Sequence, residues 1–277
     1  ICAGYLPQLS LPNLRGASAP LFVFKRRMLN KERVTSALRA SGFHLLASIF
    51  ISSLCALIIF FLWYPHPYYL MSGGVGLFLI LMTVDVVCGP MLTMIVYNPK
   101  KTIFERCLDI SLIAILQFSA LCYGIFTMWT ARPIFLVHEI DRFKVITRND
   151  VNANELTNLP ENLRPKIWKG PLTVGIREPQ NTEERSRVLF ESLQGGRDFG
   201  ERPEFYIKYD GKTSKNAQNR AKKLESFIIK YNIKSQEIAE LGDIEKLYYI
   251  PVIARQDWVA VIDEDGKIKG FLKGEGF

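Results

Sequence analysis

The chain is poor in the residues that build metal centres and disulfide bonds. Among its 277 residues there are 3 His and 5 Cys, and no cysteine follows residue 122. Disulfide bonds therefore cannot stabilise the C-terminal half. No Cys-x-x-Cys pair and no Cys/His spacing typical of a zinc site occurs. The sequence predicts no metal site and no cofactor.

Catalytic motifs are equally scarce. No Gly-x-Ser-x-Gly motif occurs, and the glycine-rich stretches at residues 73–76 and 195–196 lack the context of a phosphate-binding loop. Glu139 and Asp141 lie two residues apart in an expected strand, which would place both carboxylates on one face. Such a pair is more often a solvated strand face than a catalytic centre. We therefore expect that the protein is not an enzyme.

Three long apolar runs fill the first half of the chain, at residues 43–64, 75–97 and 108–129. Each has the roughly 20 residues that a helix needs to cross a bilayer at about 1.5 Å per residue. The first run has no charged residue, the second has only Asp85, and the third has only Asp109. A core helix of a soluble protein would carry a polar stripe, so the runs predict a three-helix transmembrane region over residues 43–130.

Basic residues predict how these helices are oriented. Six Lys or Arg residues lie between residues 25 and 39, three lie between the second and third runs, and none lies between the first and second. Because positive flanks stay in the cytoplasm, residues 28–42 are expected to be a cytoplasmic basic segment and residues 131–277 a periplasmic domain. Trp63, Tyr64 and Trp129 end their runs on the outer side, where we expect them to anchor the helices at the membrane interface.

The net charge of +8 gives no support for nucleic-acid binding. The chain has 35 Lys and Arg against 27 Asp and Glu, but residues 131–277 hold 25 of the former and 23 of the latter. An excess that small, on a mixed surface, is not the footprint of a nucleic-acid-binding protein. Residues 1–130 hold 10 basic and 4 acidic side chains and so carry +6 of the net charge, and there the lipid bilayer is the expected partner.

Residues 1–27 differ in composition from the rest of the chain. They are rich in Pro, Leu, Ser and Gly and show no periodicity, and Met28 then precedes a short polar stretch and the first run. We expect residues 1–27 to be a disordered upstream extension, with the natural start at Met28. The alternative is a disordered cytoplasmic tail.

Residues 131–277 have the length and pattern of one α+β domain. Asn181 or Thr182 is expected to cap a helix that the glycines at 195–196 end. The order of elements is too irregular for a doubly wound sheet. Helices are expected at 182–193, 214–231 and 234–241, a helical turn at 160–166, and strands at 134–140, 143–147, 172–177, 204–209, 248–254, 259–263 and 267–272. The predicted fold is thus three transmembrane α-helices followed by an α+β periplasmic domain.

Asp85 is the most informative polar residue, because an ionisable group near the middle of a span is costly and should face other helices. Pro90 removes a backbone N–H and Gly89 thins the helix, so a kinked polar locus is expected there. One interpretation makes Asp85, Gly89 and Pro90 a contact site for the helix of a partner. The other is an internal helix–helix contact, with Gln117 as the polar partner.

Several motifs resemble one known family. They are Phe-Phe-Leu-Trp-Tyr-Pro at 60–65, Asp-Val-Val-Cys-Gly-Pro-Met-Leu-Thr at 85–93, Tyr-Asn-Pro-Lys at 97–100, Arg-Pro at 132–133 and Asp-Arg-Phe at 141–143. Together they resemble the TfpX/TfpZ family of type IV pilin accessory proteins. The resemblance implies a multi-pass protein of the Gram-negative inner membrane that assists the assembly or dynamics of type IV pili, and with them twitching motility. It also implies a type IV major pilin as partner.

Two other functions fit the same topology. A membrane-bound enzyme that modifies pilin is one, although the Gly-x-x-x-x-Gly-Asp context of the prepilin protease is missing around Asp85. A membrane protein that relays a signal inward is the other, although no cytoplasmic output domain is evident.

Overall fold

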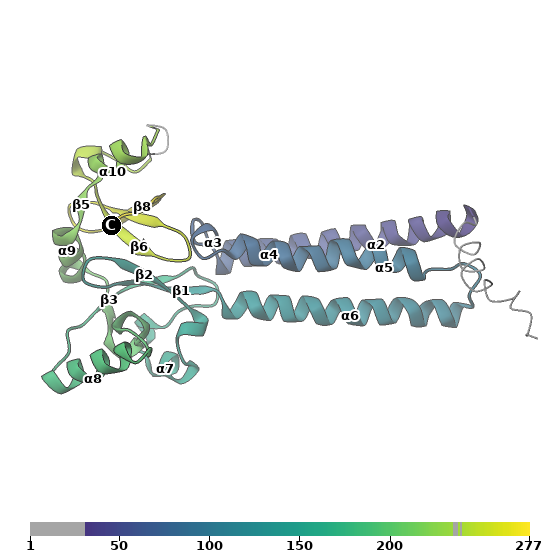
Figure 1. Cartoon of the computed structure of the whole chain (residues 1–277), viewed down its shortest axis with the longest axis horizontal. Coiled ribbons are helices and arrows are strands. Elements are labelled where there is room, and N and C mark those ends of the chain that lie inside the picture. The colour runs from purple at the N-terminus through teal and green to yellow at the C-terminus, as the bar shows by residue number, and fades with distance from the viewer. Residues whose placement is uncertain (1–30, 235–237, 239) are drawn as a thin grey trace, which may run out of the picture.

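The computed structural model describes residues 31–234, 238 and 240–277, so residues 1–30 and the predicted extension at 1–27 lie outside the described residues. The chain forms two parts (Figure 1). Three long helices run side by side as a rod, and a mixed α/β domain covers one end of that rod (Figure 1). The expected order, helices first and an α+β domain after them, is confirmed.

The described residues contain three helices that are long and apolar enough to cross a membrane, at Lys31–Trp63, Gly74–Val96 and Ile103–Thr130. Length and composition make them candidate membrane spans. A π-helical segment, η1, ends the first helix, and another, η2, interrupts the second. The elements of this part are α2 (Lys31–Ile58), η1 (Ile59–Trp63), α3 (Tyr68–Met71), α4 (Gly74–Met82), η2 (Thr83–Cys88), α5 (Gly89–Val96) and α6 (Ile103–Thr130).

The first helix starts earlier than the apolar run. Residues 31–42, expected as a cytoplasmic segment ahead of the span, already belong to α2. The guanidinium of Arg33 donates hydrogen bonds to the carbonyls of Ile95 (2.9 Å) and Tyr97 (3.5 Å), at the end of α5. Arg33 therefore satisfies the last carbonyls of the neighbouring helix, as cations near a helix C-terminus do.

The third helix begins at a capping box. The Thr102 hydroxyl accepts from the backbone N–H of Glu105, and the Glu105 carboxylate accepts from the N–H of Thr102. Asp109, the seventh residue of the helix, forms an ion pair with Lys101. The charge near the start of the third apolar run is thus neutralised within its own segment.

The α/β domain is built on an eight-stranded mixed sheet. Its strands follow the order β4-β3-β1-β2-β6-β7-β8, and β5 pairs with β6. The β1–β3 and β2–β6 pairs are parallel, and the others are antiparallel. The strands are β1 (Pro133–His138), β2 (Phe143–Thr147), β3 (Leu172–Ile176), β4 (Tyr206–Lys208), β5 (Lys222–Lys223), β6 (Tyr248–Ile253), β7 (Trp258–Ile262) and β8 (Ile268–Lys273).

Short helices surround the sheet. Figure 1 shows α7 and α8 beside β1 and β3, and α10 beside β5 and β8 at the other end. The α-helices are α7 (Ala153–Asn158), α8 (Thr182–Leu193), α9 (Gly211–Arg220) and α10 (Leu224–Tyr231). The 3₁₀ turns are η3 (Arg148–Asp150), η4 (Glu161–Leu163), η5 (Phe199–Glu201), η6 (Pro203–Phe205) and η7 (Ile244–Lys246).

The core of the domain reaches into the helical part. Tyr68 and Met71 of α3, in the link between the first two long helices, pack with buried sheet residues such as Leu136 and Ile250. The backbone N–H of Gln256 donates to the carbonyl of Met71 (3.2 Å). The link is thereby part of the domain core, which fixes the domain on the end of the helical rod.

The expected continuous helix at 214–231 is wrong. The chain forms α9 and α10 with β5 between them, and Lys222 and Lys223 pair with Tyr249 and Tyr248 of β6. The cause is tertiary, because Ala217 packs in one buried cluster while Leu224 and Phe227 pack in another. The two clusters, together with pairing of β5 to the part of β6 that β2 does not reach, override the helical pattern.

Other local predictions are confirmed at α8 and at the last hairpin. The Asn181 side chain accepts from the N–H of Glu184, and Gly195 follows the helix with φ +82°. Gly266, with φ +74°, forms the turn between β7 and β8. The sequence did not indicate α7, and the helix expected at 234–241 lies in part outside the described residues.

Candidate intramembrane contact site

The site around Asp85 is built by the π-helical turn η2. In a π-helix each carbonyl accepts from the N–H five residues later, so the Asp85 carbonyl would need the N–H of residue 90. That residue is proline, which has no N–H. The side-chain amide of Gln117, from α6, donates to the Asp85 carbonyl instead (3.1 Å). Pro90 thus creates a free acceptor, and the third helix satisfies it.

The Asp85 carboxylate lies between the helices. The residue is 6% exposed, and its Oδ1 is buried without a hydrogen-bond partner among the described residues. Gln117, the expected polar partner, therefore contacts Asp85 through the backbone and not through the carboxylate. Buried polar atoms are nearly always paired, so an unpaired one is unusual. This carboxylate oxygen can still accept a hydrogen bond from a donor that reaches it.

Gly89 permits the close approach of α6. A Cβ atom at this position would overlap with the side-chain amide of Gln117. Glycine is thus required by packing, because only a bare Cα lets the amide reach the Asp85 carbonyl. Asp85, Gly89, Pro90 and Gln117 form one connected contact, which we call the Asp85 site.

The first helix completes the site with a polar face that the sequence analysis missed. The Ser41 hydroxyl donates to the carbonyl of Pro90 (2.8 Å), and Nδ1 of His44 lies 2.6 Å from the hydroxyl of Thr93. Ser48 and Ser52 follow at helical spacing and are buried. These four residues are three or four positions apart, a spacing that places them on one face of α2. That spacing could have indicated the polar face from the sequence alone.

The predicted interface residues do not share one environment. The rings of Trp63 and Trp129 meet edge to face at 5.0 Å, and both residues are partly exposed. Tyr64 is fully buried, and its hydroxyl donates to the carbonyl of Met128 (3.0 Å). Tyr64 therefore joins the first and third helices from inside, while membrane anchoring by the two tryptophans stays a prediction. The Arg132 guanidinium covers the Trp129 ring at 3.7 Å.

The carboxylates near the first strand do not form a pair. Strand β1 ends at His138, so Glu139 and Asp141 lie in the turn after it and not on the expected strand face. Asp141 is exposed and pairs with Arg142 (2.7 Å), whose hydrogen bond lowers the pKa of that carboxyl. Burial raises the pKa of Glu139, against the opposing effect of Lys144. The two groups have different partners, and no shared site results.

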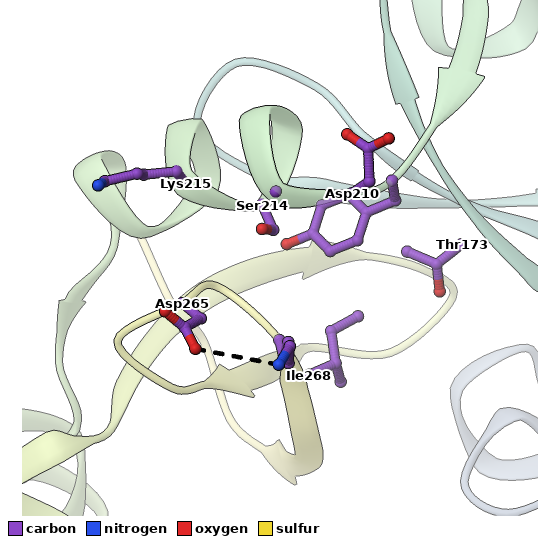
Figure 2. Close-up of a pocket in the computed structure, with 9 residues that line it drawn as sticks. Thr173, Asp210, Ser214, Lys215, Asp265 and Ile268 are labelled. Carbon is purple, nitrogen blue, oxygen red and sulfur yellow. Dashed lines mark ion pairs between the residues drawn. The ribbon is translucent and has the colours of Figure 1, made fainter.

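A hollow of about 460 Å³ lies between the start of α9 and the β7–β8 turn. Figure 2 shows the residues that line it. Asp210, Lys215, Asp265 and Lys267 contribute charges of both signs to its lining. Asp265 and Lys267 form an exposed ion pair of 3.9 Å, drawn as the dashed line (Figure 2). Exposed ion pairs of this kind contribute little binding energy, so this pair does not make the hollow a strong binding site. Within the described residues no group of three potential metal ligands occurs.

The Asp85 site has the chemistry of a helix contact. It combines a close approach at glycine, one hydrogen bond to a freed carbonyl and one carboxylate oxygen that has no partner within the described part of the chain. Such features hold helices together in a bilayer.

Comparison with known proteins identifies the family. The sequence profile of the fimbrial assembly protein FimB matches residues 32–73, from the start of α2 to the link that contains α3. A fimbrial assembly protein of serogroup I from Dichelobacter nodosus is 31% identical over 257 residues, which cover 90% of this chain and 99% of the relative. The chain belongs to the fimbrial assembly protein family.

Other fimbrial assembly proteins agree with this assignment. The serogroup E1 protein of Dichelobacter nodosus is 30% identical over 257 residues and is covered to 99%. The protein of serogroups C1 and C2 is 41% identical over 128 residues, which cover 46% of this chain and 98% of the relative. No solved structure matches the fold. A role in fimbrial assembly follows from these relatives.

Proposed function

We propose that this fimbrial assembly protein is an inner-membrane accessory protein of type IV pili, of the TfpX/TfpZ kind, that binds pilin and so assists or modulates pilus assembly. Its relatives are named for fimbrial assembly. The proposed placement has the N-terminus in the cytoplasm and the α/β domain in the periplasm, as the distribution of Lys and Arg indicates.

The observation that carries this proposal is the fixed junction between helices and domain. Tyr68 and Met71 lie in the domain core, so the link that leads into the helix of the Asp85 site is joined directly to the domain. A pilin subunit with an apolar helix and a periplasmic head would contact both parts at once. Joining two weak contacts on one molecule raises the overall affinity without any new contact.

The lipid-facing side of η2 is where a partner helix would approach. Val87 and Met91 are 48% and 58% exposed, one or two residues from the glycine and proline of the Asp85 site. The Asp85 carboxylate is 6% exposed between the helices, and its Oδ1 has no partner among the described residues, so a partner helix would have to displace a neighbouring helix to hydrogen-bond with it. The proposed role is binding, and no step of catalysis is assigned to it.

The first test measures pili in cells that carry Asp85→Asn, Asp85→Ala or Pro90→Ala. Loss of one of two linked contacts is expected to reduce pilus number by roughly tenfold, while membrane levels of the protein stay unchanged. Asp85→Asn retains the shape and removes the charge. Gly76→Ala is the matched control, because nothing lies within 4 Å of a Cβ there.

A photo-crosslinking residue at Val87 and another at Leu193, which is 82% exposed on α8, test pilin contact directly. Pilin captured at both sites, and not at the lipid-facing Leu112 of α6, is the expected result. Equal piliation of the variants together with no capture of pilin would disprove the proposal. A pilin mass that changes with this protein would instead support a modifying enzyme.

A further inference from the structure

A basic loop of the α/β domain lies against the outer end of the helical rod. A Cβ atom at Gly170 would overlap with the ring of Pro65, which follows the first long helix directly. The preceding residues 164–170, which we call the 164–170 loop, are therefore held at the level where the apolar helices end. Phe61, one turn before Pro65, is 75% exposed and marks the lipid-facing surface next to this point.

The tip of the 164–170 loop exposes two apolar side chains. Trp168 is 71% exposed and Ile167 is 46% exposed, although the domain has a large sheet core in which such residues are normally buried. Trp168 is two residues from Gly170, so its backbone lies within about 7 Å of that glycine. Tryptophan is enriched at the membrane–water interface, where its ring is apolar and its N–H is hydrated.

The charges around this tip have one sign. Lys166 and Lys169 flank the two apolar residues and are exposed. Between Glu161 and Glu178 the sequence has four basic residues and no acid. A groove of about 890 Å³ separates the loop from the link at Pro65 and Tyr68, and three basic residues and one acid line it. An exposed tryptophan between lysines complements the anionic headgroups and the acyl boundary of a bilayer.

We propose that the 164–170 loop is a second membrane contact, in which Trp168 and Ile167 enter the outer leaflet and Lys166 and Lys169 bind anionic lipid headgroups. The contact is continuous with the apolar surface of the three helices. It ties the edge of the domain to the bilayer and complements the α3 junction. The inference depends on the proposed membrane placement, and it does not depend on pilin binding.

The test uses the full chain with its five cysteines replaced by alanine, spin-labelled at one introduced cysteine and reconstituted in phosphatidylcholine vesicles with about 30% phosphatidylglycerol. Labels replace Trp168, the lipid-facing Phe118 of α6, or Leu193 of α8. Collisions with oxygen report lipid, and collisions with a nickel chelate report water. We expect positions 168 and 118 to favour oxygen and position 193 to favour the chelate.

A charge reversal tests the headgroup contact separately. Lys166→Glu with Lys169→Glu is expected to lower the ratio of oxygen to chelate collisions at position 168 several-fold. Lys212→Glu with Lys215→Glu, on the exposed start of α9, is the matched control and leaves the ratio unchanged.

Three results would overturn the inference. If position 168 behaves like 193 while 118 reports lipid, the loop lies in water. If 118 also reports water, the helices do not span the bilayer and the loop proposal falls with them. If position 168 becomes shielded only when pilin is reconstituted with the protein, the loop contacts protein and not lipid.

Discussion

At the scale of single residues, His138 has an environment that makes it sensitive to pH. It is 5% exposed on β1, between the rings of Phe143 and Tyr209, and its Nε2 is buried without a hydrogen-bond partner among the described residues. Desolvation lowers its pKa to about 4, although Asp141 acts in the opposite direction. The folded domain therefore holds this imidazole neutral at pH values where an exposed histidine is protonated.

This lowered pKa predicts a loss of stability in acid. Above the unfolded pKa of about 6.5 both states are neutral, and between that value and pH 4 the unfolded state binds the extra proton, so stability falls as pH falls. The loss attributable to His138 approaches about 3 kcal/mol at pH 4. It is measured as the difference in unfolding free energy between the protein in detergent and the His138→Phe variant from pH 7.5 to pH 4.

His66→Gln serves as the control for this measurement, because His66 is exposed in the link between the first two helices. It should retain the pH dependence of the unsubstituted protein. A His138→Phe variant whose stability declines with acid as steeply as before would show that other groups cause the acid sensitivity.

At the scale of secondary-structure elements, the second long helix is the one whose geometry is set by its neighbours. Its middle is the π-helical η2, and α2 and α6 supply the polar groups that surround it. π-Helical turns are rare and concentrate at functional sites. Here the turn places the carbonyl that Pro90 leaves free next to Gln117. The Gln117 amide can reach this carbonyl only because Gly89 has no side chain, so the packing of α6 on η2 depends on that glycine.

This packing predicts that Gly89→Ala destabilises the helical part by about 1–3 kcal/mol, because the added methyl group overlaps with the Gln117 amide. The measurement is the thermal unfolding midpoint of the full chain in detergent. Gly76→Ala, in α4 of the same long helix, has open space around it and should be neutral or slightly stabilising.

The double variant Gly89→Ala with Gln117→Ala gives a further check, because removing the amide makes room for the methyl group. We expect part of the lost stability to return, because the effects of substitutions at two residues in direct contact on the free energy of unfolding are not additive. If Gly89→Ala unfolds at the same temperature as Gly76→Ala, the close approach does not contribute to stability.

At the scale of the whole molecule, the link between the first two helices connects the rod to the domain. Two of its residues, Tyr68 and Met71, are in the domain core, and Gly73 lies against the Arg255 side chain from the loop after β6. The ends of the three helices and the sheet therefore behave as one body. This arrangement requires that the link and the α/β domain be on the same side of any membrane.

Reporter fusions test that requirement together with the proposed orientation. Alkaline phosphatase fused after Phe277, or inserted at Ser72, is expected to be active, because it would lie in the periplasm. The same enzyme inserted at Lys100, between α5 and α6, is expected to be inactive. Activity at Lys100 alone would reverse the orientation, and activity at Ser72 without activity after Phe277 would contradict the joined core.

The sequence by itself determined the features that depend on local composition. Apolar length set the three long helices, Asn181 and Gly195 set the bounds of α8, and Gly266 set the last hairpin turn. These signals are local because they act through burial of one continuous run, through a side-chain cap, or through a positive φ that glycine adopts without strain.

Only the tertiary structure decided features that join distant segments. It divided the expected helix at residue 221, because β2 pairs only with the end of β6 and leaves its start to Lys222 and Lys223. It paired Gln117 with the Asp85 carbonyl and left one carboxylate oxygen free, and it buried Tyr64 between two helices. The physical reason is the same in each case: a buried group takes whichever partner the packing brings within hydrogen-bond distance, and spacing along the chain does not specify that partner.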